Sequence, residues 1–469
     1  MSRNNAIAAA EHHLDSGGLF DDLARRVSHR TESQDVARRP ELLHYLTDEV
    51  TPTLERLGFS AQVFDNPRGP DQPPLLVAHR NEAAELPTVF GYGHGDVVRG
   101  YDDQWDDGRS PWVLEVAGDR WYGRGTADNK GQHTINIAAL EAVLGTRGRL
   151  GFNATFLVET GEETGSPGLR EFCAANRELL EADVLLASDG PRLLPEQATV
   201  FMGTRGAVNF DMTIELRAGG HHSGNWGGLL ANPAIILSHA IASITSAAGE
   251  IRVPEMRPPE LPDSVRAAIH DLPLGGEGTP QIDPCWGEPG LTPSERVFGW
   301  NSFEVLSFTA GNPDKPANAV PPRASAHCQI RFVVPCDPHM MLDGLRRHLA
   351  DNGFDDVSVT ISDEPMMATR LDPQHPWAQW AATSIETTTG LAPTLLPNLG
   401  GSLPNEVFAG LLELPTLWVP HSYGGCSQHS PNEHILDWMV RDALRIMTGL
   451  YWDLGEPGAR ELLARSPTD

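Results

Sequence analysis

Five segments of the chain carry histidine or carboxylate side chains where an apolar run ends or a helix begins. They are GYGHGDVV, YGRGTADNKGQ, LVETGEETGSPGL, ADVLLASDG and YGGCSQHSPNEH, with candidate metal ligands His94, Asp128, Glu163, Asp189 and His429. Three carboxylates and two imidazoles suit two divalent cations that share one carboxylate. The set therefore predicts a centre for two divalent metal ions.

The first segment pairs His94 with Asp96, two residues further on. In an extended chain these two side chains face the same side. Asp96 could then accept a hydrogen bond from the far ring nitrogen of His94, an arrangement that metal-bound histidines usually have. A single histidine at a strand end more often binds no metal, so this segment alone decides nothing.

The third segment places two adjacent glutamates, Glu162 and Glu163, at a turn between a strand and a helix. Adjacent side chains on a turn diverge, so one can bind a metal while the other handles protons. The plain alternative is a solvated acidic loop. Ser166 and Pro167 follow, and they suit the N-cap and first position of the next helix.

The other candidates also have ordinary explanations. Asp128 stands just before a helix, where an aspartate commonly caps the N-terminus. Asp189 could belong to a turn, and His429 could be a surface histidine. Only the five segments together favour a metal centre, because their loops would meet at the edge where α/β sheets place their active sites.

The elements that must position these residues alternate between strand and helix. After helical patterns between Leu19 and Leu57, strands are expected at 74–80, 88–98, 120–125, 153–160, 182–190 and 198–206, and helices at 131–145 and 166–180. This alternation predicts an α/β catalytic domain with a central, mostly parallel sheet.

The pattern changes near residue 207. Strands at 207–218, 302–311, 324–334 and 356–362 and helices at 231–244 and 339–353 follow the order β-α-β-β-α-β, typical of a ferredoxin-like α+β sandwich. The Pro-rich stretch 253–293 predicts loops with one short helix. We therefore expect a catalytic domain of residues 1–206 and 364–469, ending in a long helix at 434–455, interrupted by an inserted domain of residues 207–363.

Composition excludes several functions. The 469 residues carry a formal net charge of −28, which argues against nucleic acid or an anionic membrane as partner. No run approaches the roughly 20 apolar residues of a membrane helix, and the first residues lack the pattern of a signal peptide. Five cysteines, without a CxxC pair, favour a reducing cytoplasm over a disulfide framework.

Six motifs in order resemble signatures of the aminoacylase, carboxypeptidase G and carnosine dipeptidase type of di-metal peptidases. They are GHGDVV, GRGTADNKG, ETGEETGSPGL, HHSGNWGG, GGSLPN and QHSPNE, and they span nearly the whole chain. The dipeptidase branch is the most similar, because GTRG, HSG-x-x-GG and a following NP occur together.

The resemblance assigns roles to the candidate residues. It implies two divalent cations per subunit, zinc with manganese or cobalt as alternatives, one held by His94 and Asp189 and the other by Glu163 and His429. Asp128 would bridge them, and its peptide bond to Asn129 would be cis. Glu162 would be the general base for a metal-activated water, and Asp96 would orient His94.

The resemblance also implies a substrate site and a homodimer, in which the insert serves as lid and dimerisation domain. Its substrate-binding residues would be His222, Asn318, Arg331, Gly400, Gly401 and Ser402. His222 would act on the neighbouring subunit's site, although His221 beside it leaves the choice open. The guanidinium group of Arg331 suits a carboxylate, because it can donate two parallel hydrogen bonds. The alternative is that Arg331 is an ordinary charged residue on a surface strand.

The expected function is hydrolysis of a peptide or amide bond next to a free carboxylate, by a dipeptidase or carboxypeptidase. An N-acyl-amino-acid deacylase with the same chemistry is the alternative. A catalytically inactive, dimeric binding protein is a third hypothesis, disfavoured because every expected ligand and Glu162 are present. A serine hydrolase is disfavoured because no G-x-S-x-G motif occurs.

Overall fold

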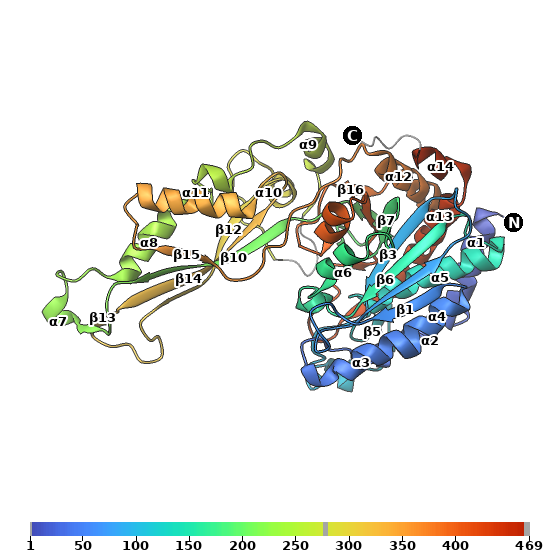
Figure 1. The fold of residues 1–469 in the computed structure, drawn as a ribbon, viewed down its shortest axis with the longest axis horizontal. Helices are drawn as coiled ribbons and strands as arrows, with labels where there is room; N and C mark the ends of the chain where they lie inside the picture. The colour runs from blue at the N-terminus through green and yellow to red at the C-terminus, as the bar shows by residue number, and fades with distance from the viewer. Residues whose placement is uncertain (1, 275–279, 464–469) are drawn as a thin grey trace.

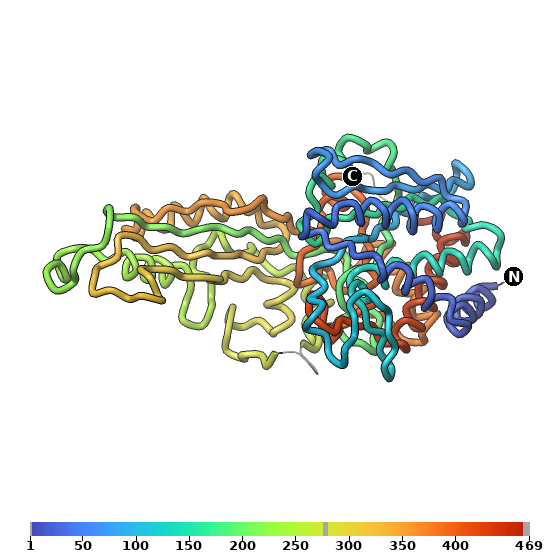
Figure 2. Tube along the Cα trace, turned by 90° about the horizontal axis from the view of Figure 1, so that it is seen from below, coloured from blue at the N-terminus to red at the C-terminus, as the bar shows by residue number. Residues whose placement is uncertain are grey.

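Two separate sheets organise the chain. The computed structural model describes residues 2–274 and 280–463, with one sheet of eight strands and another of four. Figure 1 shows the four-stranded part projecting from the body that holds the eight-stranded sheet, and Figure 2 shows the same separation from below. The insert is therefore an arm attached to a larger α/β body.

The larger sheet has the strand order β1-β2-β6-β3-β7-β17-β9-β16. Its strands are β1 (Ser60–Phe64), β2 (Leu75–Arg80), β3 (Thr88–His94), β6 (Asn153–Glu159), β7 (Val184–Ala187), β9 (Thr199–Phe201), β16 (Thr394–Leu396) and β17 (Thr416–Trp418). The central run β6-β3-β7-β17 is parallel, and so is the pair β9-β16. The remaining neighbours are antiparallel. The predicted α/β class with a mostly parallel centre is confirmed.

Helices bury both faces of this sheet, as parallel strands require. One face packs against α1 (Arg3–Asp15), α2 (Gly18–Ser28), η2 (Tyr45–Val50), α4 (Thr51–Arg56), α5 (Lys130–Arg147), α12 (Pro376–Thr389), α13 (Asp437–Leu454) and α14 (Pro457–Leu463). The short helix α3 (Arg39–His44) leads directly into η2. The other packs against α6 (Leu169–Ala175), α9 (Asp263–Ile269), α10 (Pro293–Phe298) and η6 (Val407–Leu411). On β2, Leu76 faces the first core and Leu75 the second.

Short strand pairs tie together the loops that carry the candidate residues. A three-stranded sheet joins β4 (Glu115–Ala117), β5 (Arg120–Tyr122) and β19 (His434–Leu436). A two-stranded parallel sheet joins β8 (Pro191–Arg192) and β18 (Ser422–Tyr423). The β5–β19 pair brings the loop before α5 next to the loop that contains His429. Single-turn helices η1 (Val36–Arg38), η3 (Asp106–Gly108) and η4 (Glu162–Thr164) complete the body.

The arm has the ferredoxin-like order predicted for the insert. Its elements are β10 (Gly206–Glu215), α8 (Pro233–Ile244), β12 (Ser302–Ala310), β14 (Arg323–Phe332), α11 (Pro338–Asp351) and β15 (Ser358–Ile361), and its antiparallel sheet runs β12-β14-β10-β15. Val208 and Phe210 face the core with α8 and α11, whereas Asn209 and Asp211 face outward. The expected strand with one solvated face is confirmed; the exact domain boundaries remain a prediction.

The far end of the arm holds β11 (His221–His222), α7 (Ser223–Trp226) and β13 (Ala319–Val320) (Figure 1). The Pro-rich stretch contains the 3-10 turn η5 (Pro254–Met256) and the short helix α9 before residues 275–279. Across residues 2–274 and 280–463, no helix combines the length and apolar character needed to cross a bilayer.

Several local features differ from the sequence prediction. Residues 434–436, expected to begin the last helix, form the strand β19, and α13 begins at Asp437. The patterns missed α1, whose buried residues are Ala6, Ile7, Ala10 and Leu14, and β1, which is exposed or half-buried throughout. The helix α6 starts at Leu169 with Gly168 as its N-cap, so the assignment of Ser166 and Pro167 to N-cap and first turn was wrong. Ser166 has a positive φ of 50° and donates its hydroxyl to Glu159 instead.

Candidate functional site

The carboxyl ends of three neighbouring parallel strands place candidate residues at one sheet edge. His94 is the last residue of β3, η4 with Glu162 and Glu163 follows β6, and Asp189 follows β7. Asp128 stands just before α5, and His429 lies in the loop between β18 and β19. Ligand sites of open α/β sheets lie at this edge, in the loops beyond the strands.

These loops bring the five predicted metal ligands together in two groups. His94, Asp128 and Asp189 form one, and Asp128, Glu163 and His429 form the other; within each, the ligand atoms lie within 4.8 Å of one another. Asp128 belongs to both groups. Its Oδ1 lies 2.9 Å from His94 Nε2, and its Oδ2 lies 2.9 Å from His429 Nε2.

The remaining distances complete the two groups. Asp189 Oδ2 lies 3.7 Å from His94 Nε2, and Glu163 Oε2 lies 2.9 Å from His429 Nε2. The general-base candidate Glu162 lies at their margin, with Oε2 3.9 Å from His94 Nε2. The peptide bond between Asp128 and Asn129 is cis, as the resemblance implied.

The structure also tests the ordinary explanations of these residues. Asp128 is not a helix cap, because the N-cap of α5 is Asn129 and no side chain makes a capping hydrogen bond there. Asp189 does serve a turn through Oδ1, which accepts the Gly190 N–H at 2.6 Å, but its Oδ2 faces His94. The His429 side chain is 51% exposed yet contacts two carboxylates.

Asp96 contacts both His94 and the turn that carries Glu162 and Glu163. The Nδ1 of His94 lies 3.1 Å from the Asp96 backbone oxygen and 3.4 Å from its Oδ1, so the ring presents Nε2 to Asp128. The same carboxylate accepts the backbone N–H groups of Glu162 at 3.2 Å and Glu163 at 3.1 Å. Asp96 therefore orients the histidine and also holds the turn that carries the two glutamates.

Crowding of buried carboxylates shifts their protonation. Burial raises the pKa of Glu163 to about 7 and that of Asp189 to about 6, and the charge of Asp128 adds to both. Burial also raises the pKa of Glu162 well above its usual value. Hydrogen bonds with Asp128 and Glu163 raise the pKa of His429 to about 11. The site thus favours bound positive charge.

Two orphaned oxygens show that this ligand set fits metal ions. Glu163 Oε1 and Asp189 Oδ2 are buried and have no hydrogen-bond partner among the described residues. A buried, unpartnered carboxylate oxygen is costly, and a divalent cation in each group would give each oxygen a partner. Imidazole and carboxylate donors suit Zn²⁺, Mn²⁺ and Co²⁺ alike.

A cavity of about 290 Å³ opens beside the two groups. It is lined by Asp128, Glu162, Asp189, Gly190, Pro191, Leu399, Gly401, Ser402, Leu403, Gln428 and His429. Arg331 reaches its rim from β14, where Nη1 donates to Ser402 Oγ at 2.7 Å. The Gly400 carbonyl accepts from Arg205 Nε at 2.8 Å. The structure thus brings the 400–402 loop and Arg331 next to the five clustered residues.

Two predicted residues lie elsewhere in the same chain. His222 is exposed at the far end of the arm, where its Nδ1 accepts the Gly224 N–H at 3.1 Å. Asn318 lies beside it, with its carbonyl accepting the Ser223 N–H at 2.8 Å. Figure 1 places α7 and β13, which flank these residues, away from the eight-stranded sheet. Within one chain, neither residue belongs to the cluster.

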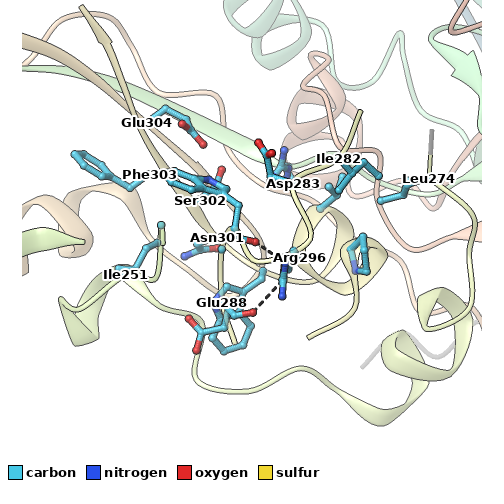
Figure 3. Close-up of a pocket in the computed structure, with 17 residues that line it drawn as sticks. Ile251, Leu274, Ile282, Asp283, Glu288, Arg296, Asn301, Ser302, Phe303 and Glu304 are labelled. Atoms are coloured by element: carbon cyan, nitrogen blue, oxygen red, sulfur yellow. Dashed lines mark hydrogen bonds between the residues drawn. The ribbon is translucent and has the colours of Figure 1, made fainter. Parts of the chain in front are cut away.

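A second cavity, of about 330 Å³, lies between the start of β12 and the loop before α10 (Figure 3). Arg296, Glu288 and Glu304 are among its lining residues, whereas none of the predicted site residues is. Arg296 is engaged in the loop itself, donating through Nε to the Glu288 carbonyl at 2.9 Å. The candidate chemistry therefore belongs to the smaller cavity.

Three contributors to the site were missed in the sequence. Gln428 donates its side-chain amide to Asp128 Oδ2. Asn129 joins two strand ends, since its Oδ1 accepts the His94 N–H at 3.4 Å and its Nδ2 donates to the Ser188 carbonyl at 2.8 Å. Glu433 binds the loop before Asp128. All three lie inside motifs noted above, so position within a motif was the only available signal.

Comparison with known proteins agrees with this geometry. Residues 91–453 match the model of Peptidase family M20/M25/M40. The chain belongs to this peptidase family. The hydrolase class expected from the motifs is thereby confirmed.

Relatives and solved structures match over most of their length. Beta-Ala-His dipeptidase of Mus musculus is 25% identical over 423 residues, 86% of this chain and 84% of that protein. Cysteinylglycine-S-conjugate dipeptidase of Corynebacterium striatum is 26% identical over 424 residues, 87% and 89% of the two chains. The fold matches the M20 metallo-carboxypeptidase Sso-CP2 of Sulfolobus solfataricus with a TM-score of 0.77 and 22% sequence identity. The match covers 93% of this chain and 99% of that chain. The fold also matches human carnosine dipeptidase 1 with a TM-score of 0.71 and 21% sequence identity, and that match covers 97% of this chain and 100% of that chain.

The raised carboxyl pKa values predict how the metal-free protein responds to pH. The pKa values of Glu163 and Asp189 are higher in the folded protein than in the unfolded chain. The protonated carboxyls therefore stabilise the fold fully at a pH below the pKa values of the unfolded chain, and this stabilisation is lost as the pH rises through about 6 to 7. Chelator-treated wild type should thus lose more free energy of unfolding in urea between about pH 5 and about pH 7 than the double variant Glu163→Gln/Asp189→Asn. Parallel pH profiles for the two proteins would contradict this.

Proposed function

We propose that the protein is a di-metal hydrolase that cleaves a peptide or amide bond next to a free carboxylate, as a dipeptidase or carboxypeptidase. The observation that carries this is the position of Asp128 between two groups of metal-ligand atoms. The names of the relatives, Beta-Ala-His dipeptidase and Cysteinylglycine-S-conjugate dipeptidase, support a small peptide as substrate.

In this proposal His94 and Asp189 hold one cation, Glu163 and His429 hold the other, and Asp128 bridges them. We propose zinc, with manganese and cobalt as alternatives, since the donors suit all three. Divalent cations in such a site polarise the scissile carbonyl and make water acidic enough to be deprotonated near neutral pH. The orphaned oxygens of Glu163 and Asp189 support this assignment.

Glu162 is the proposed general base. Its carboxyl lines the cavity next to Asp128 and Asp189, and the Asp96 carboxylate holds its backbone in place. Burial raises its pKa, so the group binds a proton readily. In that position Glu162 takes a proton from the attacking water and later delivers it to the leaving nitrogen.

Arg331 and the 400–402 loop form the proposed carboxylate subsite. Arg331 donates Nε to Gln329 at 3.0 Å and Nη1 to Ser402, so its guanidinium is held at the cavity rim. The Arg205 guanidinium lies close by, because its Nε donates to the Gly400 carbonyl. The Ser402 hydroxyl donates to the Arg205 backbone carbonyl. Two guanidinium groups bonded to the 400–402 loop, which lines the cavity through Gly401 and Ser402, favour a substrate that ends in a carboxylate.

His222 and Asn318 are proposed to serve the site of a second subunit in a homodimer. The edge strand β12 supports this, because it exposes Val305, Leu306 and Phe308 by 40%, 54% and 43%. An exposed apolar edge strand favours pairing with another chain. His222 is exposed on the same arm, free to reach a partner. The cytoplasmic location stays a prediction from composition.

The function is tested with metal-loaded protein and a panel of dipeptides and N-acyl amino acids. We expect turnover of dipeptides, and Glu162→Gln should reduce kcat by about 10²–10⁴-fold while the protein still binds metal, because general acid–base help is worth about that much. The matched control is Glu171→Gln, an exposed glutamate on α6.

Other outcomes have definite meanings. Cleavage of N-acyl amino acids without cleavage of dipeptides would select the deacylase. Binding of peptides without turnover of any substrate by the loaded protein would select the inactive binding protein. Unchanged kcat in Glu162→Gln would remove Glu162 from the mechanism.

The action of His222 across subunits is tested by co-expressing Glu162→Gln with His222→Ala. Each variant alone should be nearly inactive, whereas random pairing in a symmetric dimer should restore about a quarter of wild-type activity. His221→Ala is the matched control and should not reduce activity comparably. A monomer in analytical ultracentrifugation, or no recovery in the mixed dimer, would contradict the proposal.

A further inference from the structure

One buried glutamate joins the two loops that supply Asp128 and His429. Glu433 is 1% exposed and lies four residues after His429, immediately before β19. Its backbone carbonyl accepts the Gly123 N–H at 3.0 Å, which extends the pairing of β19 with β5. The hydrogen-bond donors to its side chain all lie in the loop from residue 124 to residue 128.

The carboxylate of Glu433 holds this loop from within. Its Oε1 accepts three backbone N–H groups, those of Gly125 at 3.1 Å, Ala127 at 2.9 Å and Asp128 at 3.1 Å. Its Oε2 accepts Arg124 Nη1 at 2.6 Å. One side chain thus satisfies donors from four of the five residues that lead to the shared carboxylate of Asp128.

Glycine at position 125 suits the bend of the loop around Glu433. Gly125 has a φ of +89°, a left-handed conformation that other residues rarely adopt. A Cβ there would also lie 3.0 Å from Lys130 Cδ and 3.1 Å from Val97 Cγ1. The backbone is therefore shaped to aim its amides at one acceptor oxygen.

The charge of Glu433 is matched by a buried arginine. Arg124 is fully buried, and its guanidinium lies 5.9 Å from the ring centroid of Trp105. Among the described residues, Arg124 Nε and Nη2 have no hydrogen-bond partner, so Glu433 is its principal contact. Because the pair is neutral overall, Glu433 acts on the site by geometry more than by attracting cations.

We infer that Glu433 is a positioning residue of the metal centre, and this rests on the function proposed above. Its carboxylate sets the distance between Asp128 and His429, which come from segments about 300 residues apart. Neither the ligand set nor the general base includes it. Residues that orient metal ligands in this way typically change metal affinity or activity by about 10–100-fold when mutated.

The test uses two double variants in which Arg124 is also replaced, so that no buried arginine is left without its carboxylate partner. Arg124→Met/Glu433→Gln keeps an acceptor oxygen for the three amides and removes both charges. Arg124→Met/Glu433→Ala removes the acceptor as well. Metal-free proteins are titrated with Co²⁺ by calorimetry, the visible spectrum of bound Co²⁺ is recorded, and the unfolding midpoint is followed by circular dichroism. Asp453→Asn, which breaks the Arg3–Asp453 pair at the end of α13, is the control for general destabilisation.

We expect the Ala double variant to bind Co²⁺ about 10–100-fold more weakly than wild type, with an altered Co²⁺ spectrum. The Gln double variant and Asp453→Asn should keep affinities close to that of wild type. If the Ala double variant does not fold, Glu433→Asp, which keeps the charge but shortens the reach, should show the same weakening.

Three outcomes would overturn the inference or its foundation. Wild-type affinity in the folded Ala double variant, or in Glu433→Asp, would make Glu433 purely structural. Equal weakening in the Gln and Ala double variants would assign the effect to the buried charges and contradict positioning by the acceptor oxygen. Failure of the wild type itself to bind Co²⁺ would instead refute the metal centre.

Discussion

The structure depends on one shared carboxylate, that of Asp128, held between the imidazoles of His94 and His429. Burial alone would raise the pKa of this carboxyl, but hydrogen bonds with His429 and His94 outweigh burial and keep it below its usual value. Both of its oxygens are in use, one for each ring. Gln428 and Glu433 also bind Asp128 or the loop that carries it.

The scaffold is built to make this meeting possible. Parallel strands deliver His94, Glu163 and Asp189 to one edge of the sheet, and the small β5–β19 pairing brings the two remaining loops together. The resulting concentration of buried carboxylates is unfavourable without positive charge, as the raised pKa values of Glu163 and Asp189 indicate. Divalent cations would relieve that repulsion, so folding and metal binding should be coupled.

Much of this was predictable from the sequence, because apolar runs with polar residues at their ends define strands and the loops beyond them. His94 and Asp189 are examples: His94 ends one buried strand, Asp189 follows another, and both reach the predicted edge. The solvated face of β10 was equally clear from its alternation. The edge strand β1 and the helix α1 were missed, because neither has a strong apolar period.

Long-range contacts set the limit of the sequence analysis. The contacts of Gln428 and Glu433 with the Asp128 loop join segments about 300 residues apart, and no local pattern encodes them. The distance of His222 and Asn318 from the cluster depends on how the arm projects from the body. Periodicity predicted the arm's strands and helices but carries no information about its direction.

The most direct test is anomalous X-ray diffraction from crystals of the protein loaded with zinc or manganese. We expect two anomalous peaks per subunit, one beside His94 and Asp189 and one beside Glu163 and His429, each within bonding distance of a different oxygen of Asp128. A single peak, or a pair of peaks that does not share Asp128, would contradict it.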